Sequence, residues 1–167
     1  MPQILPFLLA VAAATGLLPT HPTPAPVIRS DDTVAIPHGD VHMANAIREA
    51  RSRLQDFLAR ARKPDPATHT FAVKLAVPTD VSLEFIWITP FEMKDGHFVG
   101  QISNEPRNIK GIRRGQWVQF DEDGIVDWTY HQNGQRKGNF TARAIAKRLP
   151  PAEAAAFMKE YNLARDP

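Results

Sequence analysis

The sequence contains no cysteine in its 167 residues. This absence excludes disulfide bonds, thiol nucleophiles, thiolate metal sites and an acyl anchor on cysteine. A chain without cysteine is compatible with an oxidising compartment, although it does not require one. The fold must therefore be held by its hydrophobic core, which a domain of this size can supply.

Common catalytic and cofactor motifs are also missing. The chain has no Gly-x-Ser-x-Gly, no phosphate-binding P-loop, no dinucleotide fingerprint and no His-Glu-x-x-His. His38, Asp40 and His42 group three possible metal ligands, but helical metal sites use a spacing of three or four residues. We therefore predict no metal and no cofactor.

The chain lacks a strong charge of either sign. Its net charge is +2, and Lys and Arg are interleaved with Asp and Glu from Arg29 to Arg165. Nucleic-acid-binding domains usually show a clustered basic stripe, so we expect no nucleic-acid partner.

No apolar run is long enough to cross a bilayer as a helix. The longest uncharged apolar stretch, Ile4 to Leu18, has fifteen residues, whereas a spanning helix needs about 20. Its length and the small residues at 12–14 are typical of a signal peptide, despite the lack of a preceding Lys or Arg. Residues 1–18 are predicted to be a signal peptide or membrane-anchor leader; a buried helix of the domain is the alternative. The expected location is periplasmic or secreted, with no transmembrane domain in the mature chain.

Proline is abundant directly after this leader. Five prolines occur between Pro19 and Pro37, and each fixes its backbone and removes a hydrogen-bond donor. Residues 19–37 are therefore predicted to be an extended linker.

Residues 38–167 are predicted to form a single globular domain. Apolar residues at three- and four-residue steps predict a helix from Asp40 to Arg62, with Asp40 as its N-cap. Period-two patterns then predict a series of short strands, with hairpin turns at Asp95-Gly96 and Asn133-Gly134. The expected strands are 70–77, 81–89, 91–94, 97–102, 116–120, 125–131 and 135–141.

The chain is expected to end in helical segments, at 142–148 and 151–163. The order of elements predicts an α+β fold. An antiparallel sheet of about five to seven short strands would carry an N-terminal helix and a C-terminal helix.

A set of short segments in the predicted domain resembles the YegJ-like family, bacterial domain of unknown function 2314. The resemblance covers about Arg48 to Phe157 and has mild departures, with Gln116 where the family has Asp and Asn139-Phe140 where it often has Gly-Tyr. The resemblance implies the limits of the domain but no activity. The segments that carry it are Phe71-Ala72-Val73-Lys74, Phe85-Ile86-Trp87-Ile88, Gly96 to Gly100, Asn104-Glu105-Pro106, Gly115-Gln116-Trp117-Val118 and Asp127-Trp128.

Two acidic positions are candidates for a site. Asn104-Glu105-Pro106 is interpreted as a turn whose side chains cap loop N–H groups, with Glu105 as a general base in a cleft as the alternative. Asp127 lies in a predicted strand, where Asp is disfavoured, so it needs a partner such as Arg113, Arg114 or a backbone N–H. Paired with Glu105, it would instead form an acid–base couple.

Aromatic and basic residues supply the remaining candidates. Trp128 and Tyr130 share a strand face and belong either to the core or, with Phe120 or Phe140, to a groove for a peptide or sugar. The loop from Lys110 to Arg114 carries three cations, which are either solvated or in contact with an anionic partner.

These observations favour a non-enzymatic, exported binding or interaction module over an enzyme. Its unknown partner would be a protein or a cell-envelope component, bound by the sheet face and the loop from Asn104 to Arg114. The alternative is a hydrolase that uses Glu105 and Asp127. A scaffold without a dedicated ligand is a third possibility. The candidate binding residues are Asn104, Glu105, Arg113, Arg114, Asp127, Trp128 and Tyr130.

Overall fold

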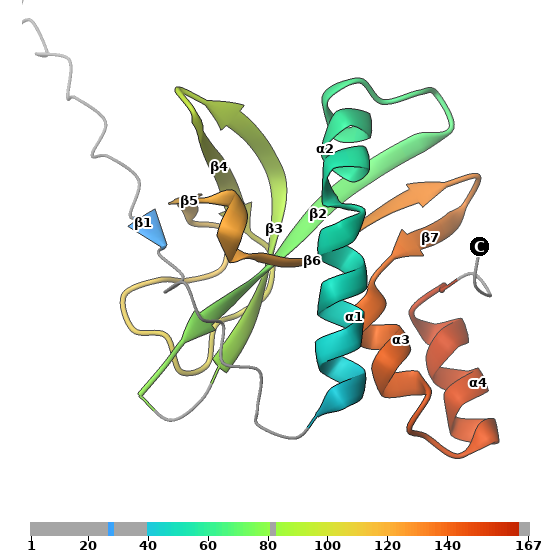
Figure 1. Cartoon of the computed structure of the whole chain (residues 1–167). Helices are drawn as coiled ribbons and strands as arrows, with labels where there is room; N and C mark the ends of the chain where they lie inside the picture. Colours follow the sequence, from blue (N-terminus) through green and yellow to red (C-terminus); the bar gives the residue numbers. More distant parts are fainter. Residues whose placement is uncertain (1–26, 29–39, 81–82, 164–167) are drawn as a thin grey trace, which may run out of the picture.

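A computed structural model describes residues 27–28, 40–80 and 83–163 of the chain. It consists of one twisted sheet with helices on one side and at one edge (Figure 1). The predicted leader and all of the predicted linker except Val27–Ile28 lie outside the described residues. Among the described helices, none has the length and apolar character needed to cross a membrane.

The sheet has seven strands in the order β1-β5-β4-β3-β2-β6-β7. Strands β2 to β7 pair antiparallel, and only β1 pairs parallel, along β5. The predicted α+β fold with an antiparallel sheet is thus confirmed. The strands are β1 (Val27–Ile28), β2 (Thr68–Pro78), β3 (Leu83–Lys94), β4 (His97–Ile102), β5 (Trp117–Phe120), β6 (Ile125–Gln132) and β7 (Gln135–Gly138).

The predicted N-terminal helix is divided into α1 (Val41–Ser52) and α2 (Leu54–Arg62). Asp40 caps α1 as expected, because its Oδ1 accepts a hydrogen bond from the Met43 N–H at 3.0 Å. The division at Arg53 follows from a tertiary contact. The Ala50 carbonyl accepts hydrogen bonds from the Trp128 indole N–H at 2.8 Å and from the Arg53 N–H at 3.3 Å. The hydrogen-bond ladder shifts to three-residue spacing there, which ends one helix and starts the next.

The main core lies between α1–α2 and the sheet face that carries Val73 and Leu75. Phe57 of α2 is its centre, with 2% of its surface exposed. The ring stacks on Trp128 at a centroid distance of 4.9 Å and also contacts Phe71, Phe91 and Tyr130. Full burial of such an aromatic side chain contributes about 1.5–3 kcal/mol to folding.

The last predicted strand was wrong at its end. β7 stops at Gly138, and Phe140 and Thr141 belong to helix α3 (Phe140–Ala146) instead. Gly138 and Asn139 both have positive φ, at 71° and 56°, so the chain turns sharply between the two elements. Two successive left-handed residues cannot continue a strand.

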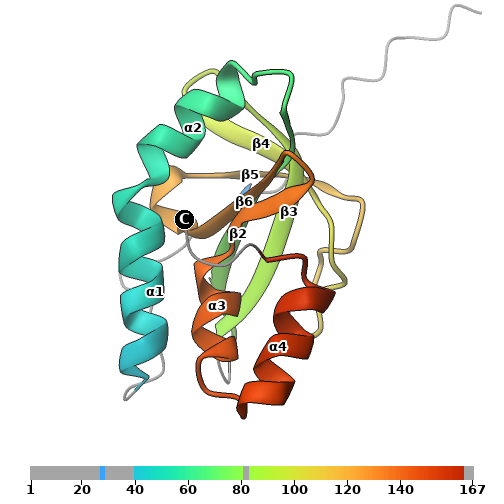
Figure 2. The same cartoon turned by 90° about the vertical axis from the view of Figure 1, so that its right-hand side faces the viewer.

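The C-terminal helix α4 (Pro151–Glu160) packs on α3 rather than on the sheet. Figure 2 shows α1, α3 and α4 side by side in that order. After α4 the chain returns to the sheet edge, where the Arg136 N–H donates to the Asn162 carbonyl at 3.0 Å and Leu163 is buried. The end of the described chain therefore covers the edge of β7.

Candidate functional site

Asp127 is fully buried and organises the start of α3. Its carboxylate accepts hydrogen bonds from the backbone N–H groups of Phe140 at 3.1 Å and Thr141 at 2.9 Å. It also accepts from the Thr141 hydroxyl at 2.5 Å and from the Trp128 N–H at 2.8 Å. The first N–H groups of a helix have no partner within the helix, so Asp127 takes the place of a helix cap. A backbone N–H partner was among those predicted for this residue.

The cation beside Asp127 is Lys74 of β2. Its Nζ lies 3.6 Å from Asp127 Oδ2, donates to the Thr141 hydroxyl oxygen, and sits 4.4 Å from the centre of the Trp87 ring. Burial lowers the pKa of Lys74, and the negative charge of Asp127 opposes that shift. Arg113 and Arg114, the predicted cationic partners, are exposed on the loop before β5.

Sequence reasoning did not identify Lys74 as part of this cluster. The available signal was a lysine in the middle of an apolar strand, flanked by Val73 and Leu75. Lysine is rarely buried without a counter-charge, so its position called for an acidic neighbour. The sequence does not give the register of β2 against β6, which places Asp127 directly opposite Lys74. Without that register, Asp127 could not be chosen as the partner.

Asn104 completes the edge of a strand. Its side-chain oxygen accepts a hydrogen bond from the Trp87 N–H at 2.6 Å, and its amide nitrogen donates to the Phe85 carbonyl at 3.4 Å. The side chain therefore continues the ladder of β3 beyond the end of β4. Asn104 thus has a structural role, but it bonds a strand and not the loop N–H groups that it was predicted to cap.

Glu105 itself is exposed. The carboxylate that holds this loop belongs to Glu84, whose side chain accepts hydrogen bonds from the backbone N–H groups of Arg107 and, at 2.7 Å, Asn108. The structure does not bring Glu105 and Asp127 together at a cavity, because Glu105 faces solvent and Asp127 is sealed beside Lys74. Neither residue lines the cavity described next.

A groove of about 670 Å³ lies between α1–α2 on one side and β6, β7 and α3 on the other. We call it the α1–α3 groove. Trp128 and Tyr130 line it, together with Phe57 and Phe140. The structure thus gathers three of the four predicted groove aromatics, whereas Phe120 stacks on Phe98 at a centroid distance of 5.4 Å elsewhere in the core.

The aromatic floor of the groove is tightly packed. Trp128 stacks on Phe57 and meets Phe140 edge-on at 5.1 Å. Trp128 and Phe140 are only 7% and 8% exposed, and Tyr130 is half-buried. Tyr130 is the most accessible of these rings, and the guanidinium of Arg60 lies 5.7 Å from its centre.

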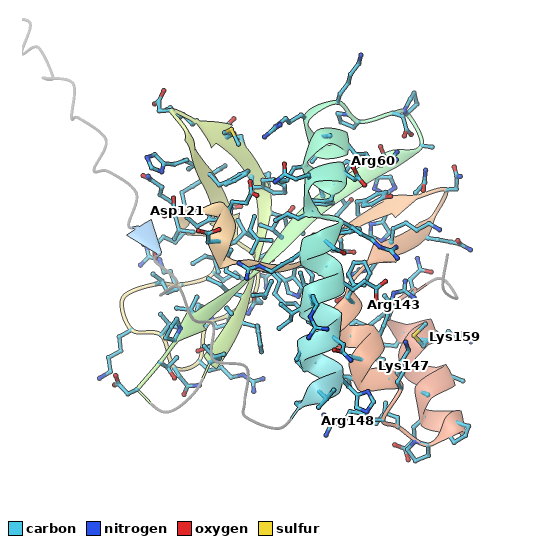
Figure 3. All side chains as sticks on the ribbon, in the orientation of Figure 1. Arg60, Asp121, Arg143, Lys147, Arg148 and Lys159 are labelled. Atoms are coloured by element: carbon cyan, nitrogen blue, oxygen red, sulfur yellow. The ribbon has the colours of Figure 1, made fainter. Side chains whose placement is uncertain are left out.

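Cations predominate on the walls. The ionised residues that line the groove are Arg53, Arg60, Lys137, Arg143 and Lys147 on the positive side and Glu49 and Asp56 on the negative side. Figure 3 shows Arg60, Arg143 and Lys147 following one another along the side of the molecule that carries β7 and α3. Of these, Arg143 is 8% exposed, and its guanidinium donates to the Gly138 carbonyl at 2.9 Å, which ties α3 to β7.

The other two tryptophans lie away from this groove. Trp117 of β5 is 44% exposed, and Trp87 is partly covered by Lys74 on the sheet face opposite the main core.

No group of three or more potential ligands that could hold a metal ion occurs among the described residues, which include Asp40 and His42 but not His38.

Comparison with known proteins assigns the family. The model of the family described as uncharacterised proteins conserved in bacteria, domain of unknown function 2314, matches residues 40–164. The chain belongs to this family. The predicted YegJ-like resemblance is thus confirmed, and the match includes both walls of the α1–α3 groove.

Two curated proteins are similar in sequence to this chain. The uncharacterised protein YegJ of Escherichia coli K12 is 30% identical over 125 residues, which cover 75% of this chain and 80% of that protein. A putative ankyrin repeat protein of Neisseria meningitidis serogroup B is 29% identical over 70 residues, which cover 42% of this chain and 28% of that protein. No solved structure gives a significant match.

Proposed function

We propose that this protein is a non-enzymatic binding module of the bacterial cell envelope, and that it holds its partner in the α1–α3 groove. The observation that carries the proposal is the lining of the groove. Five cationic side chains surround a floor of aromatic rings in a cavity of about 670 Å³, a volume within the range of known ligand sites.

The arrangement of the acidic candidates supports binding rather than catalysis. A general base must reach a substrate proton, but Asp127 is 0% exposed and its oxygens already accept four hydrogen bonds. Glu105 lies on the surface and does not line the groove. Of the predicted acid–base couple, Asp127 therefore stabilises the fold and Glu105 faces solvent.

Export is the second part of the proposal. It rests on the uncharged segment from Ile4 to Leu18 and the Pro-rich stretch that follows, which have the pattern of a leader and a spacer. Fractionation of the native bacterium with the full chain tagged at its C-terminus tests this part. Recovery in the periplasm or the medium is expected, and recovery with cytoplasmic markers would contradict it.

Binding is tested by capture from the cell envelope with the full chain and with the double variant Lys137→Glu/Lys147→Glu. Both lysines lie on the groove walls, outside the buried core. We expect the wild type to retain a partner that the variant loses while its unfolding midpoint stays unchanged. Equal retention by both proteins would show that the groove is not the binding surface.

A further inference from the structure

The charged residues that line the α1–α3 groove indicate which class of ligand it would bind. Its walls hold five cations and two anions, a surplus of three positive charges, whereas the whole chain has a net charge of only +2. The groove is therefore a positively charged concavity on a molecule with a small net charge. Resting on the function proposed above, we infer that its occupant is an extended acidic segment of a partner protein.

Four of the five cations of the groove, Arg53, Arg60, Lys137 and Lys147, are available to an incoming carboxylate. Lys137 and Lys147 form no ion pair within the described part of the chain. Arg53 pairs with Glu49 at 2.9 Å and Arg60 pairs with Asp65 at 3.1 Å, but both pairs are about half exposed. Such exposed pairs contribute about 0–1 kcal/mol each, so a ligand can displace them at little cost.

Two of these arginines are held in place by aromatic rings. The guanidinium of Arg53 lies 5.7 Å from the centre of the Phe140 ring, and that of Arg60 lies at the same distance from Tyr130. Contacts of this kind restrict the side chain while leaving the N–H groups of the guanidinium able to donate. An anionic ligand therefore loses less conformational entropy on binding here than at a mobile lysine.

The spacing of the cations suits a chain with several charges. Arg53, at the N-cap of α2, and Arg60 within α2 are seven residues apart, about 10 Å at the rise of a helix. Lys137 and Lys147 lie on the opposite wall. One small anion would contact only part of this set. In an extended peptide of polyproline II form, which has three residues per turn, carboxylates three residues apart lie on one side and are separated by about 9 Å, close to the longer spacing.

The shape of the groove disfavours two other anionic occupants. A flat membrane surface is contacted by cations that protrude from a protein. The cations of the α1–α3 groove instead line a concavity between two walls. A polysaccharide needs open ring faces for stacking, but Trp128 and Phe57 are 7% and 2% exposed and Tyr130 is already partly covered by Arg60. A peptide side chain needs only the exposed part of Tyr130, which is half-buried.

Selection of short random peptides displayed against the full chain tests the inference. Peptides selected at low salt should be enriched in Asp and Glu spaced about three residues apart. They should bind the variant Lys137→Glu/Lys147→Glu at least tenfold more weakly. A matched variant on the loop before β5, Lys110→Glu/Arg114→Glu, should bind them as the wild type does, because neither residue lines the groove.

Selected peptides without acidic enrichment, or equal binding by the groove variant, would overturn the inference. Polygalacturonate and vesicles containing anionic lipid serve as parallel probes. If either binds in the groove while acidic peptides do not, the occupant is not a protein segment, and the proposed binding function still stands. If envelope capture is insensitive to the groove variant, the proposed function itself fails, whatever the peptides show.

Discussion

At the scale of single residues, one buried carboxylate links three parts of the molecule. Asp127 of β6 caps α3, pairs with Lys74 of β2 and accepts a hydrogen bond from the side chain of Thr141. A buried charge is tolerated only when it is paired and hydrogen-bonded, and Asp127 meets both conditions. Its role is to fix the position of α3, which forms one wall of the groove.

Replacement of Asp127 is expected to destabilise the fold strongly. Asp127→Ala leaves the Lys74 ammonium buried without a counter-charge and two helix N–H groups without acceptors. Loss of one partner of a buried pair costs about 3–5 kcal/mol, which urea denaturation measures directly. Adding Lys74→Met to that variant should recover part of the loss, because it removes the stranded charge.

A loss below 1 kcal/mol for Asp127→Ala would contradict the capping role. A double variant no more stable than Asp127→Ala alone would contradict the pairing with Lys74. The single variant Lys74→Met completes the cycle and should cost less than Asp127→Ala, because the backbone donors of Phe140 and Thr141 remain satisfied.

Stability should also depend on pH through His131. Burial lowers the pKa of His131 below 6.5, and the charges of Arg136 and His69 act in the same direction. Below about pH 6.5 the unfolded chain therefore takes up a proton that the folded chain does not, and the free energy of unfolding falls as the pH falls.

Denaturation curves between pH 7.5 and pH 5 measure this dependence. Relative to the wild type, His131→Gln should lose less stability over that interval, since it removes the group whose pKa differs between the two states. Identical pH dependence in both proteins would show that His131 does not contribute.

At the scale of elements, local sequence patterns predicted most helices and strands. The Asp40 cap, the Asp95-Gly96 and Asn133-Gly134 turns and the C-terminal helix are encoded within a few neighbouring residues. The expected strands 81–89 and 91–94 form the single strand β3. Two further boundaries were wrong because distant residues set them. The Trp128 indole divides the first helix at Arg53, and Asp127 draws Phe140 and Thr141 into α3.

The turn between β7 and α3 gives a prediction at this scale. A Cβ on Gly138 would lie 2.3 Å from the Trp128 carbonyl oxygen and 2.5 Å from its ring, and the residue has φ of +71°. Gly134, in the same hairpin, has φ of +75° but nothing within 4 Å of its Cβ position. It is therefore a matched control for backbone strain without steric overlap.

Gly134→Ala should cost about 1–2 kcal/mol, the strain of a left-handed residue. Gly138→Ala should cost that amount and a further ~1–3 kcal/mol for the overlap with Trp128. Thermal unfolding of the two variants checks the difference, and equal losses would show that the close approach of Gly138 to Trp128 is unimportant.

At the scale of the whole molecule, the α1–α3 groove joins residues from 42 to 147. Trp128, Tyr130 and Phe140 could be proposed from the sequence because period-two spacing puts the first two on one face. Arg53, Arg60, Lys137 and Lys147 could not, since in the sequence they are ordinary surface cations. Only the packing of α1 and α3 beside β6 makes them neighbours.

The loop before β5 was predicted to be a binding surface because Lys110, Arg113 and Arg114 lie close together in the sequence. Arg113 and Arg114 are exposed, yet they do not line the described cavity. The cluster of cations in the sequence and the groove cations in the structure therefore indicate different binding surfaces. If the loop binds the partner, charge reversal in the loop abolishes binding; if the groove binds it, charge reversal in the groove does.

The most direct test of the central claim compares these surfaces in one experiment. The full chain, the groove variant Lys137→Glu/Lys147→Glu and the loop variant Lys110→Glu/Arg114→Glu are used to capture partners from the native cell envelope at equal amounts. Both variants reverse two charges, so their net charge is the same. We expect the groove variant to lose the captured partner and the loop variant to retain it. Retention by the groove variant, with loss by the loop variant, would contradict the account and assign binding to the loop.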